Sequence, residues 1–457
     1  MPISTERDAR AATLLIVAIS TALSLIIFTI PLTTINAVTL DLHLSAGEIA
    51  WIMSGMPLGC AVGLLTSGAL GDTYGRKKVF IGGLVVTVIA SVVAAIAQSG
   101  LVLILARVAQ GLGNAGVMAC GLGLVGQVYH GEERARATAI WAASLGGGVA
   151  IGPILASICL SLGGWQAIQW VAAVASGALA LASIRPLPES TRIPERIDLL
   201  GSVLMMAGMA FLLSSLTELR MGISVQTLLM LLASIVLITL FCFLELRVRN
   251  PIIQLDLFRR ADFVGATLAA FASGAGVLSI MTMVPTVLEQ GLGISPLFAA
   301  TILLAWSGIT VVAALAAQRL PRSLTARRRV VLGMVGCILG QMLLLLMSGD
   351  YLWPVALPGL FVSGVANGIL NASLGHAAVE SVPVERVAMG SAANNTARYL
   401  GSAIGITVSA VLISNAGSSA LSLGWREAVM ATTGFSILGL IVMVLIARRT
   451  SPASMAA

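Results

Sequence analysis

The chain has 457 residues, of which 58% are hydrophobic and only 10% are charged. Soluble proteins carry about 25% charged residues, so this composition excludes a water-soluble protein of this length. The net charge of +7 comes from basic residues scattered between apolar runs, which excludes the basic face that a nucleic-acid partner needs. The five cysteines lie in apolar segments without CxxC spacing, so we expect no disulfide, metal or cofactor.

Apolar runs long enough to cross a bilayer follow one another along the whole chain. Each crossing needs about 20 apolar residues, and the runs predict an all-α integral membrane protein with fourteen spans. The first run follows MPISTERDAR without a small-residue cleavage site, so we expect it to be retained. The predicted spans are 11–37, 49–70, 79–98, 100–126, 137–161, 166–184, 199–219, 226–246, 263–288, 296–318, 329–347, 352–375, 396–414 and 427–447.

Basic residues alternate between the connecting segments. If the amino terminus is cytoplasmic, 23 Lys and Arg residues fall in inner segments, two in outer loops, and one, Arg107, inside a span. Cytoplasmic loops carry such an excess of basic residues. We therefore expect an even number of spans with both termini in the cytoplasm.

Two sequence patterns recur in the two halves of the chain. The run QGLGNA at 110–115 matches NGILNA at 367–372, and the glycine pair Gly148 and Gly152 matches Gly401 and Gly405. We predict a six-helix bundle over 1–190, a central two-helix insertion over 191–262 and a second six-helix bundle over 263–457. Parallel repeats around a site near the midplane are typical of transporters.

The loop after the second predicted span has an unusual order of glycine, aspartate and basic residues. Glycines allow a tight turn, an aspartate accepts hydrogen bonds from a helix amino terminus, and a basic cluster faces anionic lipid. We interpret the loop as a latch that holds helix ends together in one state of the protein. The alternative is an ordinary basic inner loop. The latch residues are Gly68, Asp72, Gly75, Arg76 and Lys77.

Two polar or irregular features stand inside predicted spans. Arg107 lies roughly 10 Å from the outer boundary of the fourth span, where an unpaired charge is costly, so we expect it to have a partner. It would lower the pKa of a nearby carboxylate; the alternative is an arginine that snorkels and bonds carbonyls. Gly148, Gly152 and Pro153 predict a bent, closely packed fifth span.

The string from Gly68 to Lys78 resembles the G-x-x-x-D-x-x-G-R-[RK]-[RK] motif of the major facilitator superfamily. Arg107 to Gly113, with Gln110 and Gly111, is similar to the family's R-x-x-Q-G-x-G motif, and Gly148 to Pro153 to its G-x-x-x-G-P antiporter motif. The fourteen-span count resembles the drug/proton antiporter branch. The resemblance implies alternating access, a proton-coupling role for Arg107, Gln110 and Gly111, and a hinge or seal at 148–153; close packing alone is the alternative for that segment.

The proton carrier departs from this resemblance. Relatives often place an aspartate in the first span, whereas Ile30 to Asn36 contains no acid. The remaining candidates are peripheral carboxylates, each of which could instead be a solvated helix-end charge. Those candidates are Asp41, Glu48, Glu218 and Glu289.

The resemblance predicts export of small amphipathic compounds in exchange for protons, by a monomer in the bilayer of a bacterial cytoplasmic (inner) membrane. Uptake or facilitation of a nutrient is the alternative, supported by the missing acid. A membrane enzyme needs convergent acids and histidines, and the three histidines are dispersed, so we expect no enzymatic activity. A lipophilic cation, a neutral compound and a weak acid all remain open as cargo. The residues expected to line the substrate cavity are Asn36, Asn114, Met118, Asn367 and Asn371.

Overall fold

The computed structural model describes residues 2–190, 198–218, 224–248, 255–317, 320, 324–347, 353–382, 387–416 and 421–449. Within these residues every regular element is a helix. The chain divides into two compact units: unit 1 comprises Met1–Met206 and Val248–Ile252, and unit 2 comprises Ala207–Arg247 and Ile253–Ala457.

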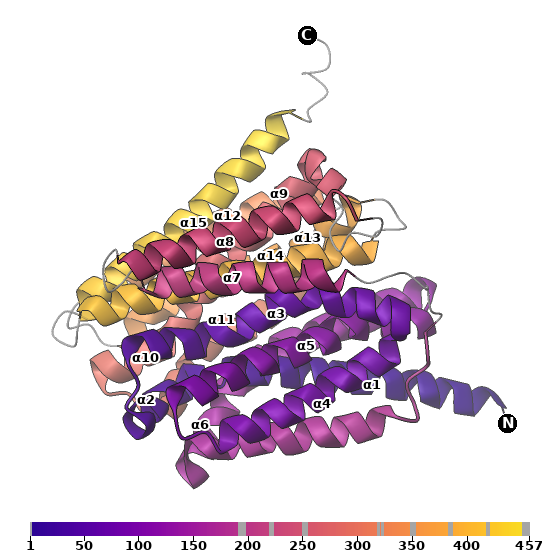
Figure 1. Cartoon of the computed structure of the whole chain (residues 1–457), viewed down its shortest axis with the longest axis horizontal. Helices are drawn as coiled ribbons and strands as arrows, with labels where there is room; N and C mark the ends of the chain where they lie inside the picture. Colours follow the sequence, from indigo (N-terminus) through magenta and orange to yellow (C-terminus); the bar gives the residue numbers. More distant parts are fainter. Residues whose placement is uncertain are drawn as a thin grey trace. The chain divides into compact units, whose positions relative to one another are not determined.

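Unit 1 is a bundle whose helices pack side by side (Figure 1). A helix break at Ile30 separates the first two helices, since Pro31 has no N–H to continue the ladder. The helices are α1 (Pro2–Thr29), α2 (Pro31–Leu42), α3 (Ala46–Tyr74), α4 (Arg76–Ala95), α5 (Gly100–Val128) and α6 (Gly131–Ser183), and α7 (Leu199–Glu218) begins in this unit.

Unit 2 begins within α7 and contains the remaining helices. A π-helical turn, η3 (Gly274–Leu278), joins α9 (Ala261–Ser273) to α10 (Ser279–Leu292). The other long helices are α8 (Val225–Glu245), α11 (Pro296–Ala316), α12 (Ala326–Leu343), α13 (Ala356–Glu380), α14 (Val387–Ala416) and α15 (Leu421–Arg449), and the 3-10 turns are η2 (Leu255–Arg259), η5 (Leu344–Met347) and η6 (Trp353–Val355).

Twelve helical runs among the described residues are long and apolar enough to cross a membrane, two fewer than the sequence predicts. One run, Arg136–Ser183, has 48 residues, about 72 Å of helix against a hydrocarbon core of about 30 Å. Its backbone leaves helical geometry at Gly163 and Gly164, which has φ 73°, so it consists of two helices. The apolar part of α7, Leu200–Leu216, is shorter than the other candidates.

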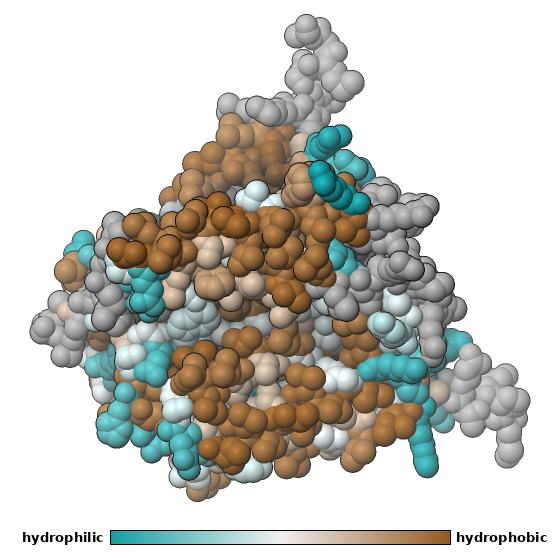
Figure 2. Space-filling view, viewed as in Figure 1, coloured by the Kyte–Doolittle hydropathy of each residue, from teal (hydrophilic) through white to brown (hydrophobic). Residues whose placement is uncertain are grey.

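The outward surface of α8 has the character of a lipid-facing helix. Leu228, Leu232 and Ile235 are each more than half exposed, and brown hydrophobic surface covers this helix in Figure 2. Apolar side chains so exposed would be unfavourable in water and are stable against lipid. The surface therefore agrees with the composition of the chain.

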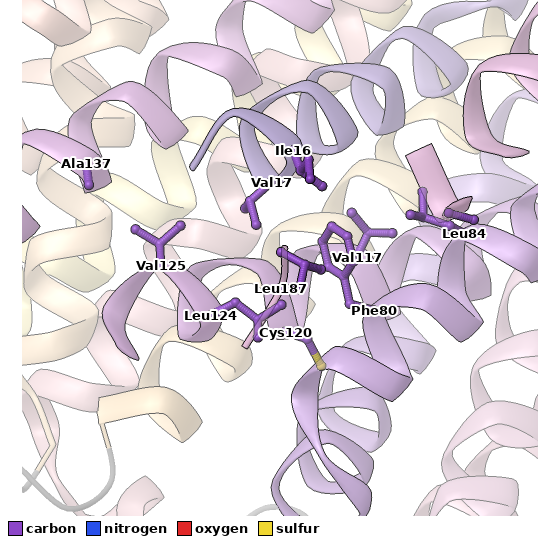
Figure 3. Packing of buried hydrophobic residues seen from close by; sticks show 11 residues of the cluster. Ile16, Val17, Phe80, Leu84, Val117, Cys120, Leu124, Val125, Ala137 and Leu187 are labelled. Carbon is purple, nitrogen blue, oxygen red and sulfur yellow. The ribbon is translucent and has the colours of Figure 1, made fainter. Parts of the chain in front are cut away.

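One hydrophobic core cluster of unit 1 includes a residue from the segment that follows α6. Leu187, which follows α6, is 2% exposed and packs with Phe80 of α4 and Val117 and Leu124 of α5 (Figure 3). Burying a leucine side chain stabilises a fold by about 1.5–3 kcal/mol. The segment after α6 is thus anchored to unit 1.

Candidate functional site

Arg107 of α5 is 1% exposed inside a candidate span. Its Nη1 donates to the Ile27 carbonyl at 2.8 Å, its Nη2 to the Phe28 carbonyl at 3.2 Å, and its Nε to the Ile52 carbonyl at 3.4 Å. These bonds join α5 to α1 and α3. The side chain does not snorkel, although carbonyl oxygens supply most of its partners.

The break between α1 and α2 explains why these carbonyls accept. In a continuous helix, the carbonyl of Ile27 would receive the N–H four residues later, but that residue is Pro31, which has none. The Ile30 N–H reaches the Ile27 carbonyl at a long 3.4 Å, and Arg107 supplies the shorter bond. Pro31 therefore leaves the Ile27 carbonyl able to accept a further hydrogen bond in the first span, and Arg107 of the fourth span donates it.

Gln110, one turn along α5, extends this contact into a network. Its Oε1 accepts from Arg107 Nη1 at 2.9 Å, and its Nε2 donates to Ser91 Oγ at 3.0 Å and to Gln169 Oε1 at 2.9 Å. Ser91 lies on α4 and Gln169 on the second part of α6, and all of these side chains are buried. The sequence singled out Gln110 but missed Ser91 and Gln169, because residues distant in the chain meet only in the fold.

Gly111 has a packing role beside this network. A Cβ at Gly111 would meet the Met56 carbonyl and the backbone of Gly59 on α3, so α3 and α5 approach backbone to backbone. Cys60 on α3 donates its thiol to the Gly111 carbonyl at 3.3 Å. Close contact at Gly111 fixes the face from which Arg107 reaches α1 and α3.

The three cavity candidates of unit 1 lie in different settings. Asn114 is 2% exposed, and its Oδ1 accepts from Ser24 Oγ at 3.0 Å and Thr87 Oγ1 at 3.5 Å. Met118 is 7% exposed, whereas Asn36 on α2 is half-buried. Asn114 therefore ties α5 to α1 and α4 in this structure.

Gly148 and Gly152 let α6 approach α1 closely. A Cβ at Gly148 would collide with the Ala22 carbonyl, and one at Gly152 with Thr29 Oγ1. Pro153 follows inside α6, and its carbonyl accepts from Thr33 Oγ1 at 3.3 Å. The geometry is that of tight packing between α6 and α1.

The glycine-rich loop forms the junction of α3 and α4. Gly75 ends one helix and begins the next with φ 110°, a conformation that favours glycine. The Arg76 N–H donates to Ser190 Oγ at 2.8 Å, and its side chain lies against Gly123 of α5. A Cβ at Gly68 would meet open space, and Lys77 is half-buried. Asp72 lies within α3, but its side chain is outside the described residues.

Unit 2 has its own arginine, Arg398, inside a candidate span; in the sequence analysis it is one of the 23 basic residues counted in inner segments. The helix α14 begins at Val387 and its candidate span at Ala392, so Arg398 lies about 9 Å inside. Its Nη2 donates to Asn395 Oδ1 at 2.9 Å and its Nη1 to Asn371 Oδ1 of α13 at 3.5 Å. Asn371 is half-buried, and Asn367 is buried with its Nδ2 3.5 Å from Thr310 Oγ1. Asn371, which accepts from Arg398, belongs to the repeated NGILNA string, and this repeat was the sequence signal for the site in unit 2.

The predicted carboxylates lie at helix ends. Asp41, at the end of α2, is exposed and accepts from Trp165 Nε1 at 2.8 Å and Gln166 Nε2 at 3.3 Å. Glu218 ends α7, and Glu289 lies near the end of α10; both are half-buried. Sequence analysis missed Glu245, which is 3% exposed at the end of α8.

The recorded bonds define what this site can do. Among the described residues, the hydrogen bonds of Arg107 go to three backbone carbonyls and the amide oxygen of Gln110. None of these bonds pairs the positive charge of the guanidinium with a carboxylate. Such a charge lowers the pKa of any acid brought near it. No group of three metal-ligating side chains occurs in the described part of the chain.

Comparison with known proteins identifies the family of this chain. Residues 16–406 match the family described as Major Facilitator Superfamily. The methylenomycin A resistance protein of Bacillus subtilis (strain 168) is 26% identical over 460 residues, covering 98% of each chain. The probable actinorhodin transporter of Streptomyces coelicolor is 30% identical, covering 81% of this chain and 67% of that one. The multidrug resistance protein Stp of Mycobacterium tuberculosis (strain CDC 1551 / Oshkosh) is 28% identical, covering 87% of this chain and 75% of that one.

Solved structures agree in fold. The POT family transporter PepTSo matches with a TM-score of 0.69 at 14% identity, covering 95% of this chain and 97% of that one. The human organic anion transporter MFSD10 matches with a TM-score of 0.62 at 15% identity, covering 95% and 99%. At these identities the likeness concerns the arrangement of helices.

Proposed function

Because the chain belongs to the Major Facilitator Superfamily, we propose that it exports small amphipathic or lipophilic compounds in exchange for protons, by alternating access. The observation that carries the proposal is similarity over 98% of the chain to a protein named for methylenomycin A resistance. The relatives named for multidrug and quinolone resistance support the same direction of transport. The cargo is a small molecule, and the chain acts as a monomer, without a cofactor and without enzymatic activity.

We propose fourteen spans for this transporter, with both termini in the cytoplasm and insertion in a bacterial inner membrane. The break at Gly163 and Gly164 supports two spans within α6. The 20 residues of α7 supply the other, because about 20 apolar residues suffice. The division into bundles at 1–190 and 263–457 with a central insertion at 191–262 follows from this count.

Energy coupling is the part of the proposal that depends on Arg107. A proton moving inward through 100 mV supplies about 2.3 kcal/mol, and a carrier acid must load and unload it. We propose that Arg107, positioned by Gln110 and Gly111, makes proton release from such an acid sensitive to cargo. The candidates are Glu289, Asp41 and Glu218.

A facilitator that transports down a gradient is the second candidate. It is favoured by the recorded partners of Arg107, which are carbonyls and an amide rather than an acid. Inverted membrane vesicles with an imposed pH gradient separate the two functions. Cargo-dependent dissipation of the gradient supports exchange, and cargo flux that ignores the gradient overturns it. A growth panel of toxic compounds in a pump-deficient host identifies the cargo to use in these vesicles.

The remaining site residues have proposed roles in the conformational cycle. Gly68, Asp72, Gly75, Arg76 and Lys77 form the latch, and Gly148, Gly152 and Pro153 form a hinge or seal. Asn36, Asn114, Met118, Asn367 and Asn371 line the cargo cavity. The variant Asp72→Asn tests the latch: we expect slower transport with normal insertion, and unchanged turnover would reject this role.

A further inference from the structure

A cavity of about 290 Å³ opens in unit 1 where α1 begins and α5 ends. Its volume is near the lower end for small-ligand sites. It is separate from the network around Arg107, and no role has been assigned to it above. Its lining residues are Ala9, Arg10, Thr13, Gln127, Val128, His130, Pro186 and Pro188.

The wall contributed by Pro186 and Pro188 is fixed in place. Thr13 Oγ1 donates to the Pro186 carbonyl at 3.3 Å. Leu187, between the two prolines, is buried in the core of unit 1 (Figure 3), and Ser190 Oγ accepts from the Arg76 N–H. A core side chain and two hydrogen bonds therefore hold this wall, so the cavity is a built feature of the unit.

The lining combines basic groups with an orphaned acceptor. Arg10 is half-buried and His130 is exposed. The Oε1 of Gln127 is buried without a hydrogen-bond partner among the described residues, which costs roughly 1–3 kcal/mol unless a donor fills the site. A matching ligand carries an anionic group and, beside it, a hydrogen-bond donor.

The charge of Arg10 is felt at this end of α5. Burial raises the pKa of Tyr129, as does the exposed carboxylate of Glu133, and Arg10 lowers it. Glu133 is not part of the cavity lining. Among the residues that line the cavity, Arg10 and His130 are basic and none is acidic, and this composition favours an anion.

The cavity lies at the end of two candidate spans, Asp8–Thr29 and Gly100–Val128. Lipid headgroups occupy this depth, just outside the hydrocarbon core. We propose that the cavity binds a phosphate diester with a hydroxyl-bearing headgroup, as in phosphatidylglycerol. The phosphate contacts Arg10 and His130, and a glycerol hydroxyl donates to Gln127 Oε1.

Native mass spectrometry of the delipidated full chain, incubated with vesicle lipids of defined composition, tests this proposal. We expect phosphatidylglycerol to bind about tenfold more tightly than phosphatidylcholine, which has no headgroup donor; one hydrogen bond is worth about that factor. Equal binding of the two lipids overturns the proposal. Displacement of the lipid by millimolar glycerol 3-phosphate assigns the site to a soluble ester and overturns the lipid assignment.

Matched variants locate the binding. Arg10→Gln and Gln127→Leu should each weaken phosphatidylglycerol binding about tenfold. Arg185→Gln is the control, because Arg185 is exposed, adjoins Pro186 in sequence and does not line the cavity. Gln127→Glu keeps the acceptor but adds a negative charge, and should repel the same lipid. Unchanged binding in Arg10→Gln, with normal size-exclusion behaviour, rejects the site.

Discussion

The two copies of the QGLGNA and NGILNA repeat use the same backbone with different electrostatics. In unit 1, α5 places Arg107 three residues before Gln110, and its guanidinium donates to the Ile27 carbonyl, which lacks the usual helical donor because residue 31 is proline. In unit 2, the residue three before Asn367 is Gly364, where a Cβ would lie 2.8 Å from the Trp306 carbonyl. Unit 2 interrupts its corresponding first helix with the π-turn η3 instead. Close helix packing is thus common to the two repeats, and the polar contacts differ.

The glycine pairs show a feature that the two repeats share, which is close approach between helices. Gly148 and Gly152 place α6 against α1, and Gly401 and Gly405 place α14 against α9 and η3, where an added Cβ would collide with the carbonyls of Phe271 and Ala275. The shared role of these pairs is therefore close packing between equivalent helices. A gating role of Gly148 and Gly152 would be a further property beyond this packing.

The largest effect is expected from breaking this shared packing. Gly152→Leu and Gly405→Leu should each destabilise the fold by about 3 kcal/mol or more, lowering the Tm by roughly 6–12 °C for a bundle of this size. Gly147→Leu and Gly434→Leu are the controls, since a Cβ at either meets open space. Thermal unfolding in detergent measures the difference, and equal shifts in test and control variants contradict the comparison.

Removing the cation of unit 1 should have the next largest effect. Arg107→Met removes the guanidinium hydrogen bonds to the Ile27 and Phe28 carbonyls, costing roughly 1–3 kcal/mol, and should abolish cargo-dependent proton flux. Pro31→Ala supplies a backbone N–H to Ile27, so the double variant should regain about 1 kcal/mol. Additive losses in the double-mutant cycle would show that the proline and the arginine act independently.

Arg398 offers a milder test in unit 2. Arg398→Gln removes one hydrogen bond of 2.9 Å and one of 3.5 Å, and the asparagine partners can bond the new amide. We expect a stability change within about 1 kcal/mol and a smaller loss of transport than in Arg107→Met. A larger loss of transport than in that variant would reverse the ranking of the two units.

The smallest effect concerns the asparagines that follow in each repeat. Asn114→Ala removes an acceptor of two buried hydrogen bonds and should cost about 1 kcal/mol, whereas Asn371→Ala removes one long bond and should cost less. Both variants should also change the concentration of cargo giving half-maximal transport. Unchanged cargo dependence in both would remove them from the proposed cavity.

Sequence reasoning reached the family, the helical class and the residues with local geometric meaning. Gly75 was predicted because a turn between two helices needs a glycine-like backbone, and Gly148 and Gly152 because their spacing implies a packed face. Membership in the family is confirmed by the match over residues 16–406. The roles assigned to these residues stay predictions.

Tertiary partners lay beyond the sequence. Ser91 and Gln169 belong to helices far from Gln110 in the chain, and no periodicity links them. The predicted span 396–414 begins two residues before Arg398, because a charged residue near an apolar run is typical of a span boundary, whereas α14 starts eleven residues before it. The missing i+4 donor to the Ile27 carbonyl follows from Pro31, but the fold alone shows that Arg107 donates to it.

The two glycines that interrupt α6 leave almost no polypeptide between its helical parts. In the proposed topology, this turn faces the outside, and Gly164 has a left-handed φ of 73°. This turn therefore offers proteases, antibodies and impermeant thiol reagents almost no accessible loop on the outer face. Mapping of the outer face by inserted tags should therefore fail here even though the chain emerges from the bilayer.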